Sequence, residues 1–225
     1  MRFSILYLSL FALFFGLLSY SHAQIRVACV GNSITFGSGI ENREQYSYPA
    51  QLQTMLGKGW EVRNFGVSGR TMLKKGNQPL WEEEAFANAL AFKPNVVVIK
   101  LGTNDSKDFN WKYKEDFVSD FQAMVDTFQS VSDPLIFVCI PVPVFGDRWN
   151  IDSTVMVEEV NPRIMQVAAS NDLMTIDLYH PFLGKPELFP DLIHPSGHGA
   201  ALMAGIIASH LLANDHAILM QTVRP

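Results

Sequence analysis

Short apolar runs alternate with helical patterns along this chain, and this alternation constrains its fold more than any other feature. Five runs have the length and composition of buried strands: 25–30, 60–65, 96–101, 135–140 and 174–177. The stretches that follow them predict helices at 48–57, 81–92, 113–131, about 161–170 and about 196–212, with Asn161 capping the fourth and Pro162 in its first turn. Repeated β–α units require right-handed crossovers, so the pattern predicts an α/β fold with a parallel sheet covered by helices on both faces.

The first 23 residues have the features of a secretory signal peptide rather than of the fold. Arg2 supplies a positive charge, residues 5–18 are almost entirely apolar, and Ser21-His22-Ala23 places small residues at a cleavage site. The alternative is a retained membrane anchor, but the apolar run is shorter than the roughly 20 residues that a spanning helix needs. Gln24 occupies the position where a bacterial lipoprotein would have cysteine. We therefore expect cleavage after Ala23, a single domain at 24–225, and a secreted or periplasmic protein with no membrane contact after cleavage.

Charge and cysteine content exclude some partners and leave others open. The chain has 22 acidic and 17 basic residues, a formal charge of −5, and no cluster of lysine and arginine. This balance argues against nucleic acid as a partner. Cys29 and Cys139 both fall inside predicted strands, so we expect them to be unpaired and buried, although a secreted protein could form a disulfide. Nothing in the sequence indicates an oligomeric state.

Polar residues suited to one chemistry follow four of the predicted strands. In a parallel sheet these loops meet at one edge, where α/β proteins place their ligands. Taken singly, each residue has an ordinary structural explanation, as a turn glycine, a turn-forming asparagine, a cap or a loop histidine. The residues are Ser33 between Gly31 and Gly37, then Gly66, then Asn104, and last Asp191 with His194. Their occurrence together and in this order is better explained by a catalytic site than by four separate structural roles.

Acyl transfer requires a nucleophile, a base, a group that orients the base, and donors for the oxyanion. Ser33 is the candidate nucleophile and His194 the candidate base, with Asp191 close enough in a turn to orient its ring. The backbone N–H groups of Ser33 and Gly66 and the side chain of Asn104 are the candidate oxyanion donors. This set needs no cofactor and no metal. His198 follows His194 at a spacing that can bind metal on a helix, but His194 precedes the expected helix cap Ser196, so we expect no metal site.

The same residues resemble the SGNH subset of the GDSL esterases and lipases, named for Ser, Gly, Asn and His in four separate blocks. Four stretches carry the resemblance: Gly31-Asn32-Ser33-Ile34-Thr35, Asn64-Phe65-Gly66-Val67-Ser68-Gly69, Gly102-Thr103-Asn104-Asp105 and Asp191-Leu192-Ile193-His194-Pro195. The chain departs from the family at Asn32, where many members have aspartate. Because the family's triad acid comes from the last block, this departure is expected to change how the serine loop is held rather than to remove catalysis.

The resemblance implies a fold, a set of roles and a range of substrates. It implies a three-layer α/β/α fold with a mainly parallel, flavodoxin-like five-stranded sheet. It also implies a Ser33–His194–Asp191 triad, an oxyanion hole from Ser33, Gly66 and Asn104, and hydrolysis without a metal. The pairing of the first two blocks looks most like bacterial carbohydrate O-acetylesterases. The expected function is therefore a secreted serine esterase that hydrolyses O-acyl esters, with O-acetyl esters of carbohydrates as the first candidates, through an acyl-serine intermediate.

Two other functions stay open at the level of sequence. One is a thioesterase or lysophospholipase of the same family, because fold and triad do not set the substrate. The other is a non-catalytic glycan-binding protein on the same fold, which would have no need of a nucleophile, base and acid. Trp81, Arg148 and Trp149 could contact a sugar, but such residues more often cover the core, so they are not part of the predicted site.

Overall fold

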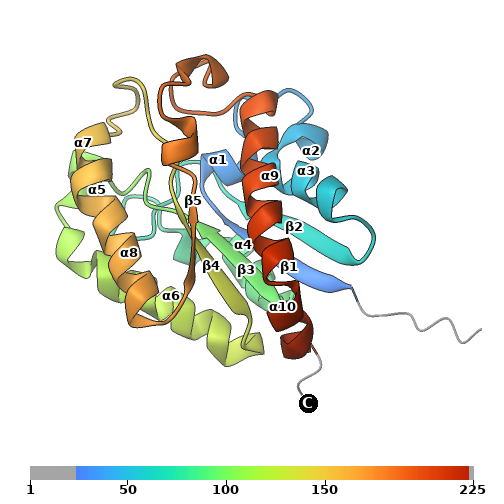
Figure 1. The fold of residues 1–225 in the computed structure, drawn as a ribbon. Helices are drawn as coiled ribbons and strands as arrows, with labels where there is room; N and C mark the ends of the chain where they lie inside the picture. The colour runs from blue at the N-terminus through green and yellow to red at the C-terminus, as the bar shows by residue number, and fades with distance from the viewer. Residues whose placement is uncertain (1–23, 223–225) are drawn as a thin grey trace, which may run out of the picture.

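The computed structural model describes residues 24–222 and contains one five-stranded parallel sheet (Figure 1). The strands are β1 (Ile25–Gly31), β2 (Trp60–Gly66), β3 (Val96–Lys100), β4 (Leu135–Ile140) and β5 (Met174–Asp177). Their order is β2-β1-β3-β4-β5, and all four neighbouring pairs are parallel. This is the flavodoxin-like order, so the fold predicted from the sequence is confirmed.

Helices and short helical turns connect these strands. Those before β4 are α1 (Ser33–Phe36), α2 (Arg43–Tyr46), α3 (Tyr48–Leu56), η1 (Leu80–Glu82), α4 (Glu84–Ala91), α5 (Asp108–Trp111), η2 (Lys114–Asp116) and α6 (Phe117–Ser132). Those after β4 are α7 (Ser153–Val155), the π-helical η3 (Met156–Val160), α8 (Asn161–Ser170), η4 (His180–Phe182), η5 (Pro186–Leu188), α9 (Gly197–Ala213) and α10 (Asp215–Thr222).

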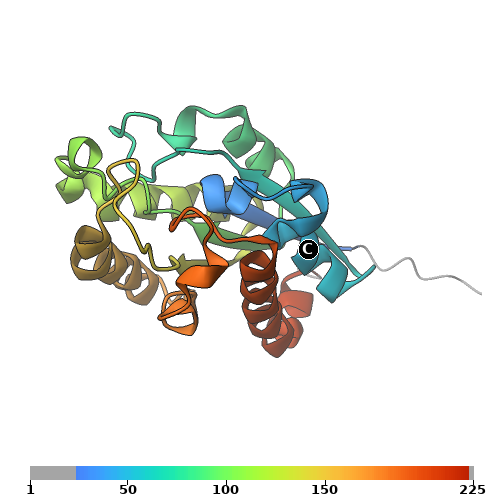
Figure 2. The ribbon, with the colours of Figure 1, turned by 90° about the horizontal axis from the view of Figure 1, so that it is seen from above.

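The sheet separates two hydrophobic cores because its side chains alternate between the two faces. On one face Val30, Val97 and Ile99 pack under α4, α6 and α8. On the other face Val27 and Val98 pack under α3, α9 and α10. Seen from above, α4 and α9 lie on opposite sides of the sheet (Figure 2). The result is the expected three-layer arrangement, in which both faces of every central strand are covered.

Three helix predictions need correction. The helix expected at 81–92 is preceded by the turn η1 and begins only at Glu84, and the helix expected at 113–131 begins after η2, at Phe117. Asn161 does not cap a helix. Asp152 does, accepting from the N–H groups of Thr154 and Val155, and the chain then runs through α7 and η3 into α8. Pro162 lies inside this helical stretch and has no N–H to donate, which fits a change from π-helical to α-helical bonding just before it.

Other features lie outside the sequence predictions or outside the described residues. The helices α1, α2, α5 and α7, of three or four residues, are too short for periodicity to predict, and the eight-residue terminal helix α10 was also not predicted. Cys29 and Cys139 are buried and unpaired. The predicted signal peptide, residues 1–23, lies outside the described residues. Among residues 24–222, no single helix has the length and apolarity to cross a membrane, although α9 and α10 together, bent by 67°, pass that test.

Candidate active site

Ser33 lies where β1 ends and α1 begins, at the carboxyl edge of the sheet. Asn32 caps α1, because its side-chain oxygen accepts from the N–H of Ile34 at 3.2 Å. Gly31 is required just before this turn, since a Cβ there would lie 2.6 Å from the carbonyl oxygen of Lys100 and closer still to the side chain of Thr35. The turn therefore holds Ser33 as the first residue of a helix, with a backbone N–H that has no intrahelical partner.

Asp191 and His194 form a tight turn that fixes the histidine ring. One carboxylate oxygen of Asp191 accepts from the backbone N–H groups of Ile193, at 3.0 Å, and His194, at 2.6 Å. The other oxygen lies 2.7 Å from Nδ1 of His194. Partial burial opposes ionisation of this carboxyl group, but the hydrogen bonds from His194 and Ile193 outweigh it and hold its pKa below the usual value.

The structure brings these residues together across 161 positions of sequence. Nε2 of His194 lies 2.9 Å from Oγ of Ser33, so Asp191, His194 and Ser33 form one continuous chain of hydrogen bonds. This is the geometry that a serine nucleophile, its general base and the orienting acid require.

The three candidate oxyanion donors differ in how free they are. The N–H of Ser33 is unpaired within α1, as described above. Asn104 uses one amide hydrogen on the carbonyl of Arg70, at 3.0 Å, which leaves the second hydrogen for another acceptor. The N–H of Gly66 donates to the side chain of Asn64 at 2.9 Å, so it could reach an oxyanion only by sharing or releasing that bond.

The sequence profile of the GDSL-like Lipase/Acylhydrolase family matches residues 29–202, which include every residue of this site. The chain belongs to this family. The resemblance identified from the four motifs is thereby confirmed, and by class the domain is a carboxylic ester hydrolase.

Among similar proteins, the acetylxylan esterase of Xylanibacter ruminicola is 46% identical over 204 residues, a stretch covering 82% of this chain. The match spans only 42% of that relative. The fold is also similar to two solved structures. Est24, a carbohydrate acetylesterase from Sinorhizobium meliloti, matches with 17% identity, a TM-score of 0.66, and coverage of 84% of this chain and 99% of the other. A putative arylesterase from Agrobacterium tumefaciens matches with 21% identity, a TM-score of 0.65, and coverage of 84% and 98%.

A buried lysine lies behind the serine loop of this GDSL-family domain, and the sequence reasoning missed it. Lys100 ends β3 and is 0% exposed. Its Nζ donates to the side-chain oxygens of Asn32, at 3.4 Å, and Thr103, at 3.1 Å. These acceptors neighbour Ser33 and Asn104, so one side chain connects the loop of Ser33 with the loop of Asn104. Burial without a carboxylate partner lowers the pKa of Lys100 from 10.5 to about 7. A lysine at the end of an otherwise apolar run was the signal available in the sequence.

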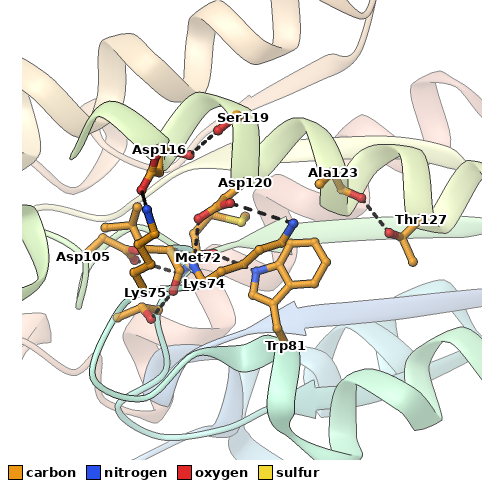
Figure 3. A network of polar contacts seen from close by, with 12 residues as sticks. Met72, Lys74, Lys75, Trp81, Asp105, Asp116, Ser119, Asp120, Ala123 and Thr127 are labelled. Carbon is orange, nitrogen blue, oxygen red and sulfur yellow. Dashed lines mark hydrogen bonds and ion pairs between the residues drawn. The ribbon is translucent and has the colours of Figure 1, made fainter. Parts of the chain in front are cut away.

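Carboxylates also fix the loop that follows β2. Asp105 accepts from the N–H groups of Met72, at 3.1 Å, and Leu73, at 2.8 Å, and Asp120 accepts from Lys74 at 2.8 Å. Figure 3 shows both carboxylates pointing at this loop, with the indole of Trp81 beneath it. Trp81 donates to the carbonyl of Met72 at 2.8 Å and packs against the core, so it supports this loop.

A second aspartate–histidine turn serves as an internal comparison. His180 lies 2.6 Å from Asp177 through Nδ1, with the same three-residue spacing as the pair at the site. Its side chain is 74% exposed, and no serine hydroxyl in the described part of the chain is hydrogen-bonded to its ring. Within residues 24–222, no group of three or more His, Cys, Asp or Glu side chains could hold a metal ion.

Proposed function

We propose that this protein is a secreted serine esterase that removes O-acetyl groups, most simply from carbohydrates, through an acyl-serine intermediate. The observation that carries the proposal is the hydrogen-bond chain from Asp191 through His194 to the hydroxyl of Ser33. Membership of the acylhydrolase family supports the ester chemistry. The acetylxylan esterase relative supports the acetyl group and the carbohydrate, within the part of that protein that the chain matches.

The proposed reaction has two matched halves. His194 takes the proton of Ser33 as its oxygen attacks the ester carbonyl, and the negative charge that develops is stabilised by the N–H of Ser33 and the side chain of Asn104. His194 then gives the proton to the leaving alkoxide, which departs as the alcohol and leaves an acetyl-serine. Water attacks that ester with His194 again as base, which releases acetate and restores the serine.

The preferences for the acyl group and for the alcohol of the ester can both be measured with the wild-type protein. Acetate release from acetylated xylan is compared with hydrolysis of p-nitrophenyl acetate, butyrate and octanoate. The proposal predicts acetate release from the polysaccharide and a decrease in kcat/KM as the acyl chain lengthens. A preference for octanoate would instead support a lipid esterase, and binding of xylan without turnover of any ester would support a glycan-binding protein.

Secretion is a separate part of the proposal and rests on the first 23 residues. The positive residue Arg2, the apolar run and the small residues before Gln24 predict a mature N-terminus at Gln24. Intact-mass measurement of protein exported by its host tests this. Retention of residues 1–23 would show a membrane anchor in place of a signal peptide.

A further inference from the structure

A large aromatic side chain beside His194 is exposed to solvent. Trp149, in the loop between β4 and α7, is 52% exposed. The centroid of its ring is 5.2 Å from that of His194, with the two rings tilted by 55°. Exposed single hydrophobic residues are common on proteins. Exposure and contact with His194 therefore do not by themselves show that Trp149 binds a ligand, and two further observations bear on this question.

The first observation is that this loop is attached to the site on both sides. The N–H of Phe145 donates to the carbonyl of Leu192, inside the Asp191–His194 turn, at 2.8 Å. Gly146 packs so closely on Leu192 that a Cβ would lie 2.7 Å from its side chain. On the other side, the N–H of Asp152 donates to Oγ of Ser106, in the loop that carries Asn104, at 3.2 Å. The loop that carries Trp149 is thus attached at one end to the Asp191–His194 turn and at the other end to the loop that carries Asn104.

The second observation is backbone strain at Trp149 itself. Trp149 and Asn150 both have left-handed conformations, with φ of 53° and 58°. Bulky side chains rarely adopt this region, and strained residues of this kind gather at functional sites. Here the strained residue is the one whose indole contacts His194, in a loop whose two ends are fixed by the hydrogen bonds of Phe145 and Asp152.

The position of Trp149 indicates which part of a substrate it would meet. In the proposed reaction His194 gives its proton to the leaving-group oxygen, so that oxygen must lie next to Nε2 of His194. The group attached to that oxygen therefore lies close to the ring of His194, which the indole of Trp149 contacts. Arg148, whose guanidinium carbon is 5.9 Å from the indole centroid, adds hydrogen-bond donors to the same surface.

We infer that Trp149 is the platform on which a sugar ring of the leaving group stacks, and that it sets the preference for carbohydrate esters. A pyranose has an apolar C–H face and a polar rim, which match an exposed indole beside a guanidinium. An acyl chain has no such rim. This inference rests on the proposed function and adds to it the residue that recognises the alcohol.

The test compares two acetate esters that differ only in the alcohol. One is an acetylated xylo-oligosaccharide and the other is ethyl acetate, whose alcohol is too small to stack. Trp149→Ala should lower the ratio of their kcat/KM values about tenfold, mainly through a higher KM for the oligosaccharide, as expected for a lost aromatic contact. Trp149→Phe should retain most of the ratio. Met55→Ala, which removes an exposed apolar side chain at the far end of α3, should leave the ratio unchanged.

Three results would overturn the inference. An equal decrease for both esters in Trp149→Ala and Trp149→Phe would mean that Trp149 only holds His194. A decrease that follows acyl length in a series of ethyl esters would place the acyl chain on Trp149. Unchanged kcat/KM values for both esters in Trp149→Ala would mean that Trp149 takes no part in recognising the alcohol. If the wild type hydrolyses neither ester, the proposed function fails first, so the two failures are distinguishable.

Discussion

At the scale of single residues, the hydrogen bonds of His194 give unequal roles to its neighbours. His194 moves a proton in every step of the proposed reaction, whereas Asp191 orients the ring and stabilises its charged form. His194→Ala is expected to lower kcat by about four to six orders of magnitude, and Asp191→Ala by about one or two orders less. Steady-state kinetics with p-nitrophenyl acetate measures both. His180→Ala is the matched control and should retain the wild-type kcat. Equal decreases of kcat in Asp191→Ala and His194→Ala would contradict this division of roles.

A second prediction at this scale concerns Lys100 and the way in which the free energy of unfolding depends on pH. Its pKa is about 7 in the folded protein and near 10.5 when unfolded, so between these values the unfolded chain binds more protons. The free energy of unfolding should therefore rise with pH in this window, by up to about 1.4 kcal/mol per pH unit from this group. Cys139 on β4, whose pKa burial raises to about 12, stays neutral there.

Lys100→Met isolates this contribution, because all other titrating groups remain. Urea unfolding of both proteins at pH 7 and pH 10 should show that the stability of Lys100→Met, relative to wild type, is higher at pH 7 than at pH 10. Parallel profiles would mean that the lysine is charged in the folded protein throughout this range, which its burial argues against.

At the scale of elements, the site depends on how closely β2 approaches α1. A Cβ on Gly66 would lie 2.3 Å from the backbone nitrogen of Phe36 and 2.7 Å from the carbonyl carbon of Thr35. Gly66→Ala must therefore displace the helix that begins with Ser33, and we expect a loss of about 1–3 kcal/mol of stability together with most of the activity. Gly59→Ala, just before the same strand, meets nothing within 4 Å and should change neither. Thermal unfolding and esterase assays of both variants test this, and a fully active Gly66→Ala would show that the contact is unimportant.

At the scale of the whole molecule, the sequence predicted the strands and the longer helices, and it missed helices of three or four residues and the terminal α10, although α1, α5 and α10 each place one apolar side chain in a core. The five strands, the sheet and the helices against it follow from period and composition. Ser33, Asn104, Asp191 and His194 were instead identified as polar residues that follow predicted strands and through the resemblance to the SGNH esterases, and the structure joins Asp191, His194 and Ser33 by hydrogen bonds. The bond from Lys100 to Asn32 and the ring of Trp149 beside His194 join residues that are distant in sequence, and no local pattern reports such contacts. The Gly66 N–H, already bonded to Asn64, was likewise invisible before the fold was known.

The central claim is that Ser33 is a nucleophile activated by His194, and covalent labelling tests it most directly. A fluorophosphonate is incubated with the folded protein, and the modified residue is identified by peptide mass spectrometry. The account predicts one adduct, on Ser33, that is absent from Ser33→Ala, forms far more slowly in His194→Ala, and forms at the wild-type rate in His180→Ala. Labelling of a different residue, or an unchanged rate in His194→Ala, would contradict it.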